Sequence, residues 1–178
     1  MNPIQTLLKA EIEDAVKMEN SFTRLPKLME LYKTNARRPG WREAWFECLG
    51  FEWTCCDNIW KFKKSLRRIF ARWTELWPLL MEDSEREQWN ALPEYVTIFR
   101  GCGPQNKCGL SWSTSREVAT NIVFLNRYMT HFPILLAAHV PKSAIVALKN
   151  GRQENEAIAL VSEGDILFIE RILARASS

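Results

Sequence analysis

The chain has 178 residues, of which 47% are hydrophobic and 25% charged, and its formal net charge is +3. A chain of this length and hydrophobicity can bury a substantial core, and so small a charge does not by itself indicate nucleic-acid binding. It has no apolar run of about 18 residues, so no transmembrane helix and no membrane partner are predicted. The N-terminus lacks the basic and then apolar layout of a signal peptide, so we expect a cytoplasmic protein.

The five cysteines do not fit a secreted disulfide framework, because the count is odd and Cys55 and Cys56 are adjacent. Cys102 and Cys108 flank a glycine-containing loop, but no histidine lies near them, which makes a poor zinc site. We therefore expect reduced, structural cysteines and no bound metal.

The first 91 residues predict a helical region. Its helices are expected at Pro3–Glu19, Leu25–Tyr32, Trp41–Leu49 and Asp57–Trp77, and from Ser84 to the residue before Pro93. In the fourth helix Asp57 can serve as the cap, and one face carries apolar residues at helical spacing: Ile59, Phe62, Leu66, Ile69, Trp73 and Trp77. Ser84 with Glu87 predicts a capping box for the fifth.

The stretch from Asn58 to Thr74 contains basic residues and no acid. The basic residues are Lys61, Lys63, Lys64, Arg67, Arg68 and Arg72. They form either a docking surface for an acidic or nucleic-acid-bearing target or a solvated helix face. The sequence leaves both interpretations open.

After Pro93 the pattern becomes β-rich, with short segments bounded by turn residues. Strands are predicted at Tyr95–Arg100, Leu110–Ser113, Pro133–Val140, Ala144–Leu148, Glu156–Val161 and Ile166–Ile172, and one helix at Arg116–Met129. The sequence thus predicts an α+β chain with a helical N-terminal region, residues 1–91, followed by a small mixed β-sandwich, residues 92–178.

Two motifs lie on the first two predicted strands. Arg100-Gly101 ends the first; arginine suits phosphate oxygens and glycine lets a ligand approach the backbone, although most strand-end arginines are surface residues. Ser111-Trp112-Ser113 forms the second, where alternation places both serines on one face as a polar pocket wall. The residues that follow also fit a helix cap, and both interpretations can hold.

A third motif, Glu154-Asn155-Glu156, leads into a later strand. Two carboxylates two residues apart share a face there, and like charges so close need a cation nearby unless one of them is protonated. The alternative is a solvated acidic turn.

Together these motifs, in this order, resemble the ADP-ribosyltransferases of the arginine–serine–glutamate type, and the spans GLSWSTSREVA and VPKSAIVALKNGRQENEAIAL look like their small phage and bacterial branch. The resemblance covers roughly residues 92 to 173. It leaves two registers for the serine motif, of which the spacing to the following helix favours Ser111 over Ser113 as the first serine.

The resemblance implies a sandwich of the ADP-ribosyltransferase type and a mono-ADP-ribosyltransferase that takes NAD⁺ as cosubstrate, without a metal, and modifies a protein acceptor. It implies that Glu156 stabilises the developing positive charge on the ribose and that Glu154 orients or deprotonates the acceptor. Ser111 is then expected to hold Glu156 and the ribose, with Trp112 and Ser113 beside it in the NAD⁺ site. Arg100 is expected to bind the pyrophosphate or adenosine ribose, and the Gly101 backbone the nicotinamide amide.

The phage-like branch also suggests an effector that inactivates host or defence machinery from the host cytoplasm. Two other functions remain open. One is a non-catalytic binding or inhibitor module on the same fold, and the other is an NAD⁺ glycohydrolase with water as the acceptor.

Overall fold

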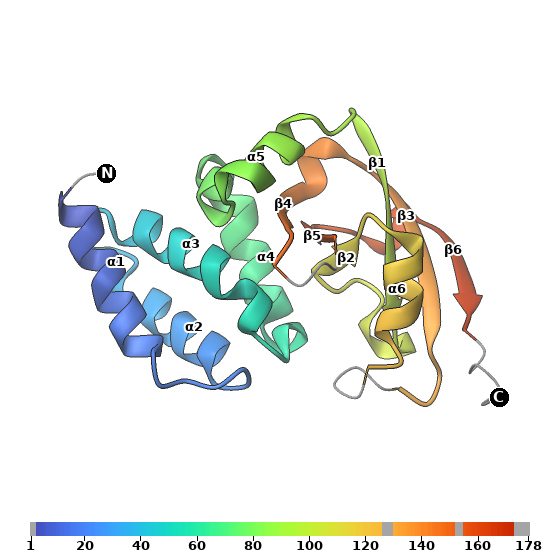
Figure 1. Cartoon of the computed structure of the whole chain (residues 1–178), viewed down its shortest axis with the longest axis horizontal. Helices are drawn as coiled ribbons and strands as arrows, with labels where there is room; N and C mark the ends of the chain where they lie inside the picture. Colours follow the sequence, from blue (N-terminus) through green and yellow to red (C-terminus); the bar gives the residue numbers. More distant parts are fainter. Residues whose placement is uncertain (1–2, 126–129, 152–154, 173–178) are drawn as a thin grey trace. The chain divides into compact units, whose positions relative to one another are not determined.

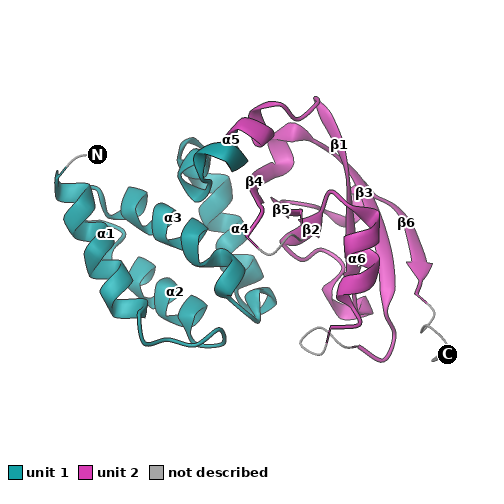
Figure 2. Ribbon diagram, in the orientation of Figure 1, with its two compact units in different colours: residues 1–86 teal, residues 87–178 magenta. Residues whose placement is uncertain are grey.

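The computed structural model describes residues 3–125, 130–151 and 155–172. It divides the chain into two compact units, residues 1–86 and 87–178 (Figure 2). The division falls inside helix α5 (Asp83–Asn90), a few residues before the boundary expected at residue 92.

The first unit is helical, and three of its α-helices pack together (Figure 1). The elements that precede α5 are α1 (Pro3–Val16), α2 (Arg24–Asn35), α3 (Trp41–Glu52), η1 (Trp53–Cys55), η2 (Ile59–Phe62), α4 (Lys63–Arg72) and η3 (Thr74–Leu80). The first three helices are confirmed with end residues shifted by up to a few positions. Helix α5 begins at Asp83 rather than at Ser84, and the carboxylate of Glu85 accepts a hydrogen bond from the Glu82 backbone N–H (3.0 Å).

The prediction of one helix over Asp57–Trp77 is wrong. Asn58 has a left-handed backbone (φ 59°), and η2 follows it before α4 begins at Lys63. Helix α4 stops at Arg72 because Trp73 takes a non-helical backbone (φ −125°, ψ 57°). The Trp73 indole N–H donates to the Tyr32 hydroxyl (3.0 Å). This tertiary contact accompanies the end of the helix. It could not be predicted from the spacing of apolar residues between Asp57 and Trp77.

The tryptophans of this unit are mostly core residues. Trp41, Trp45 and Trp53 are almost fully buried. The Trp45 indole N–H donates to the Leu28 carbonyl (2.7 Å), so burial costs it no hydrogen bond. Trp60, at 57% exposed, is the exception among the large aromatic residues near α4.

The second unit is built on one six-stranded sheet with the order β4-β5-β2-β1-β3-β6. The strands are β1 (Tyr95–Cys102), β2 (Ser111–Ser113), β3 (Ile134–Pro141), β4 (Ile145–Lys149), β5 (Glu156–Ala159) and β6 (Ile166–Arg171). All six predicted strands are confirmed, as is the α+β class. Every pair of neighbours is antiparallel, so the sheet is not mixed, and the structure gives one sheet rather than two.

Alternation along the strands gives the sheet an apolar face. Its buried residues come from both halves of the strand order: Val96, Ile98, Trp112, Leu136, Ala138, Leu148, Ala157 and Ala159. Residues Trp89 and Leu92 pack against this core. The opposite face of β1 and β2 carries helix α6 (Arg116–Ile122). This helix ends before the predicted Met129, and residues 126–129 lie outside the described part of the chain.

Gly101 sets how closely α6 approaches β1. A Cβ atom at this position would lie 2.0 Å from the Ala119 carbonyl oxygen and 2.9 Å from a Val123 methyl group. Because the first obstacle is backbone, the helix itself would have to move. Glycine at 101 is therefore a packing requirement of the helix–sheet contact.

All five cysteines are free thiols in the structure. Burial raises the pKa of Cys48 and of Cys56 to about 12. Burial therefore favours the uncharged form of both thiols. Within the described residues no helix has both the length and the apolar character needed to cross a membrane.

Replacing Gly101 with alanine should lower the free energy of unfolding by about 1–3 kcal/mol, the usual cost of overpacking a close contact. The measurement is urea denaturation, compared with a Gly164→Ala control. A Cβ at Gly164 meets nothing within 4 Å, so the control should change stability by less than about 0.5 kcal/mol. Equal effects of the two substitutions would contradict the packing role of Gly101.

Candidate functional site

Strand β2 places the serine motif between β1 and the strand that begins with Glu156. Ser113 lies opposite Phe99 of β1 on one side and opposite Glu156 of β5 on the other. Lys149 of β4 lies opposite Glu156 in turn. Residues directly opposite each other in antiparallel strands share a face, so Lys149, Glu156, Ser113 and Phe99 form one row on the side of the sheet that α6 covers.

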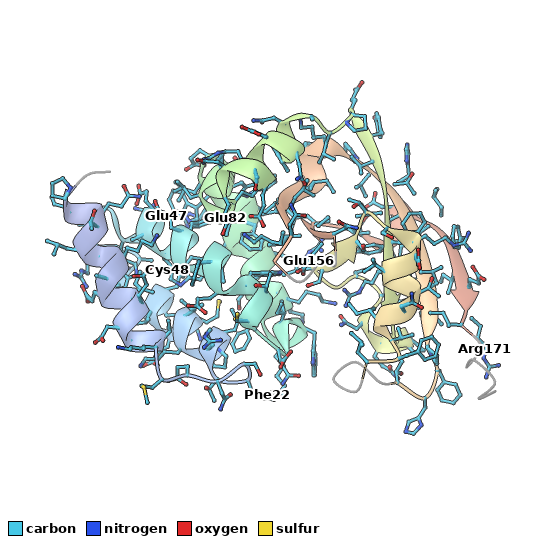
Figure 3. The ribbon with its side chains drawn as sticks, in the orientation of Figure 1. Phe22, Glu47, Cys48, Glu82, Glu156 and Arg171 are labelled. Atoms are coloured by element: carbon cyan, nitrogen blue, oxygen red, sulfur yellow. The ribbon has the colours of Figure 1, made fainter. Side chains whose placement is uncertain are left out.

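Ser113 and Glu156 are both buried, with exposed fractions of 6% and 8%. Figure 3 labels Glu156, the first residue of β5. Directly opposite residues have Cβ atoms about 4.5–5.5 Å apart, so the serine hydroxyl and the carboxylate project from adjacent points of the same face. The structure thus brings together two of the residues that the sequence singled out.

The residues after Ser113 fix the direction of its hydroxyl. Its Oγ accepts a hydrogen bond from the Ser115 backbone N–H (3.1 Å), which leaves the hydroxyl hydrogen as a donor. The Ser115 Oγ accepts from the Val118 backbone N–H (3.3 Å) and so caps α6. The cap expected near residue 115 is therefore present, and both serines of β2 lie on one face of the strand as expected.

The backbone just before Glu156 has an unusual conformation. Asn155 has φ 44°, one of two non-glycine residues with positive φ among the described residues. Asparagine tolerates this left-handed region better than most residues. The Asn155 carbonyl accepts from the Thr114 backbone N–H (2.9 Å). This bond ties the entry of β5 to the exit of β2, which fixes where the Glu156 side chain begins.

Ser111 shares the face of Ser113 but lies opposite Ile158, not Glu156. The register therefore favours Ser113, with Ser113-Thr114-Ser115 as the serine motif, over Ser111 for holding Glu156. Glu154 lies outside the described residues.

Trp112 is placed in the hydrophobic core rather than beside the serines. It is 2% exposed, and its indole N–H donates to the Gly109 carbonyl (2.9 Å). Alternation sends its side chain to the sheet face opposite that of Ser113. The role that the structure shows for Trp112 is packing in the core, and its expected contact with the cosubstrate stays a prediction.

Arg100 holds the loop between β1 and β2. Its Nε donates to the Asn106 carbonyl (3.1 Å) and its Nη1 to the Ser111 carbonyl. The guanidinium lies against Gly109, where a Cβ would sit 2.3 Å from Nη2. Burial raises the pKa of the Cys102 thiol, and the nearby Arg100 guanidinium opposes that rise. Arg100 lies on the face opposite Ser113 and Glu156, so its observed contacts are structural rather than directed toward the serine–glutamate row.

Gly101 was expected to offer its backbone to nicotinamide. Its observed role is the contact with α6 described above, where the Ala119 carbonyl leaves no room for a side chain. The Arg-Gly pair thus anchors a loop and a helix around the row rather than lining it.

Sequence reasoning missed Lys149, which is 5% exposed at the end of β4. The available signal was the hairpin itself. Lys149 ends an otherwise apolar strand just before Asn150-Gly151, and Glu156 begins the next strand. Residues at the two ends of a hairpin connection lie opposite each other, which predicts their pairing.

The basic residues near α4 are placed in the first unit. Lys61, Lys64, Arg68 and Arg72 are exposed, and Lys63 and Arg67 are half-buried. The Trp73 ring lies beneath the guanidinium groups of Arg42 (4.1 Å) and Arg72 (5.1 Å). These contacts are typical cation–π pairs and order part of the basic face.

In the described residues, no group of three or more His, Cys, Asp or Glu side chains is arranged to hold a metal ion.

Comparison with known proteins yields no matching family model, no matching curated protein and no matching solved structure.

Replacing Arg100 with methionine should lower the free energy of unfolding by about 1.5–3 kcal/mol, because hydrogen bonds from a charged donor to two loop carbonyls are lost. Urea denaturation measures the loss, with Lys107→Met in the same loop as the control. Calorimetry with NAD⁺ adds a second test of Arg100. A variant of unchanged stability but tenfold weaker NAD⁺ binding would show that Arg100 acts as a ligand and not as a loop anchor.

Proposed function

We propose that residues 87–178 form a mono-ADP-ribosyltransferase domain that transfers ADP-ribose from NAD⁺ to a protein acceptor. The observation that carries the proposal is the placement of Ser113 directly opposite Glu156, both buried, on adjacent strands. A second observation supports it. The three motifs that resemble the family lie on β1, on β2 and at the start of β5, which are consecutive in the strand order.

The reaction breaks the bond between nicotinamide and ribose, and the bonding electrons leave with nicotinamide. Positive charge develops on the ribose as in glycoside hydrolysis. A fixed carboxylate stabilises that charge best when the protein orients it beforehand. Glu156 supplies the carboxylate, and Ser113, held by the Ser115 N–H, supplies a directed hydroxyl beside it. Glu154, two residues before Glu156, is proposed to orient the acceptor.

The acceptor nucleophile then attacks the ribose carbon from which nicotinamide has left, and the proton it loses passes to a nearby base. The basic face formed by Lys61, Lys64, Arg68 and Arg72 is proposed to recruit an acidic target. A target of this kind would fit an effector that inactivates host machinery. The chemistry itself requires only the second unit.

Glu156→Gln should reduce nicotinamide release from labelled NAD⁺ by about a hundredfold or more, because it removes the charge that stabilises the transition state. The dissociation constant for NAD⁺ should stay within about tenfold, since the amide keeps the shape of the carboxyl. The matched control is Glu163→Gln, which changes an exposed glutamate of η7 (Glu163–Asp165) and should retain full activity.

The same assay in a cell lysate, followed by mass spectrometry of labelled species, separates the candidate functions. Labelled protein supports a transferase. Nicotinamide release without labelled protein identifies a glycohydrolase, and NAD⁺ binding without turnover identifies a binding module. Near-normal turnover by Glu156→Gln would refute the site.

Ser113→Ala should lower turnover about tenfold or more, and Ser111→Ala should lower it less, because only Ser113 lies opposite Glu156. Initial rates of nicotinamide release compare the two, and thermal unfolding checks that both variants are folded. A larger loss with Ser111→Ala would restore the register that the sequence spacing favoured.

A further inference from the structure

Among the described residues of the chain, four polar or charged residues are buried, and three of them belong to one row of the sheet. Ser113, Lys149 and Glu156 are 6%, 5% and 8% exposed, and the fourth, Glu85, lies elsewhere in the chain. The next positions on the same face of β4 and β5 are apolar, since Ala147 and Ile158 lie opposite each other and both are fully buried. On these two strands the charge of this face is therefore concentrated at Lys149 and Glu156, and the next position of β2 is the uncharged Ser111.

Buried charges persist where an opposite charge or hydrogen bonds compensate them. The register places the cationic Lys149 and the anionic Glu156 opposite each other, with Cβ atoms about 4.5–5.5 Å apart in such a pair. An opposite charge within about 4–6 Å favours the charged form of a carboxyl group. Ser113 flanks Glu156 on the other side. Glu156 thus stands between a cation and a hydroxyl.

Strand β4 is held at both ends, which fixes Lys149. The Trp89 indole N–H donates to the Ile145 carbonyl (2.8 Å) at the start of the strand. At its end, the Asn150 side chain donates to the Gln88 side-chain oxygen (3.0 Å). Both anchors come from the α5 residues of the second unit. An edge strand clamped in this way can present its last side chain at a constant position.

We propose that Lys149 is the positioning residue of Glu156: its ammonium group pairs with the Glu156 carboxylate and orients it for the reaction. The inference rests on the proposed function and adds a third residue to the pair that carries it. Lys149 acts through Glu156 and does not contact NAD⁺. Loss of the Lys149 ammonium group should therefore change kcat rather than the KM for NAD⁺.

The first experiment needs no substrate. Thermal unfolding is measured for the wild type, Lys149→Met, Glu156→Gln and the double variant. Lys149→Met keeps the apolar stem of lysine but leaves a buried carboxylate without its cation, so its Tm should fall by about 5 °C or more. In the Glu156→Gln background the same substitution should lower Tm by less than half as much. Equal losses in both backgrounds would overturn the pairing.

The second experiment measures steady-state NAD⁺ consumption. Lys149→Met should lower kcat about tenfold or more and leave the KM for NAD⁺ within about threefold, and Lys149→Arg should recover part of kcat. In the Glu156→Gln background Lys149→Met should cause no further loss. Lys107→Met is the control, because Lys107 lies in the loop between β1 and β2, outside the row, and its kcat should not change. A raised KM with unchanged kcat would instead make Lys149 a ligand of NAD⁺ and overturn the proposal.

The two experiments distinguish failure of the proposed function from failure of the proposed Lys149–Glu156 pairing. If the wild-type chain consumes no NAD⁺, the proposed function is wrong, and thermal coupling alone decides whether Lys149 holds Glu156. If Lys149→Met does not accumulate as folded protein, recovery of folded protein in the double variant demonstrates the coupling. Failure of both variants to fold would count against it.

Discussion

The pairing of β2 with β5 is the constraint on which the second unit depends. Strand β2 is only Ser111–Ser113, yet it joins β5 to β1 and hence the two halves of the sheet. Backbone bonds hold the pair at both ends, from Thr114 N to Asn155 O (2.9 Å) and from Ala159 N to Leu110 O (2.9 Å). Because side chains alternate along a strand, a slip of one residue would exchange the core and site faces completely. The register is therefore fixed by burial as much as by hydrogen bonds.

One face of this sheet forms the apolar core, and the other face carries the polar row. Trp112 and Ala157 point to the apolar core, whereas their neighbours Ser113 and Glu156 point to the other face. The Arg-Gly motif contributes to both faces without joining the polar row. Arg100 secures the loop before β2 through backbone carbonyls, and Gly101 admits α6 on the side of the site.

The sequence predicted all six strands because each is a short β-rich run between strong turn signals. It failed between Asp57 and Trp77, where apolar residues keep helical spacing but Asn58 and Trp73 take non-helical backbones. The break at Trp73 is accompanied by a hydrogen bond to Tyr32, a partner distant in sequence. The sequence predicted that a serine of the second strand lies beside Glu156, but it favoured Ser111 rather than Ser113. Spacing to the next helix favoured Ser111, whereas the serine that lies opposite Glu156 is set by the register of β2 with β5, which no local pattern encodes.

The serine motif also connects the site to the helix that covers it. Ser113 accepts from the N–H of Ser115, and the Ser115 side chain caps the first turn of α6. The same helix rests on Gly101 through the Ala119 carbonyl. A shift of α6 would therefore move the Ser115 N–H, and with it the direction in which the Ser113 hydroxyl points. Since preorganised polar groups act only when their geometry is held by supporting contacts, the close approach of α6 to β1 is a condition for the orientation of the hydroxyl beside Glu156.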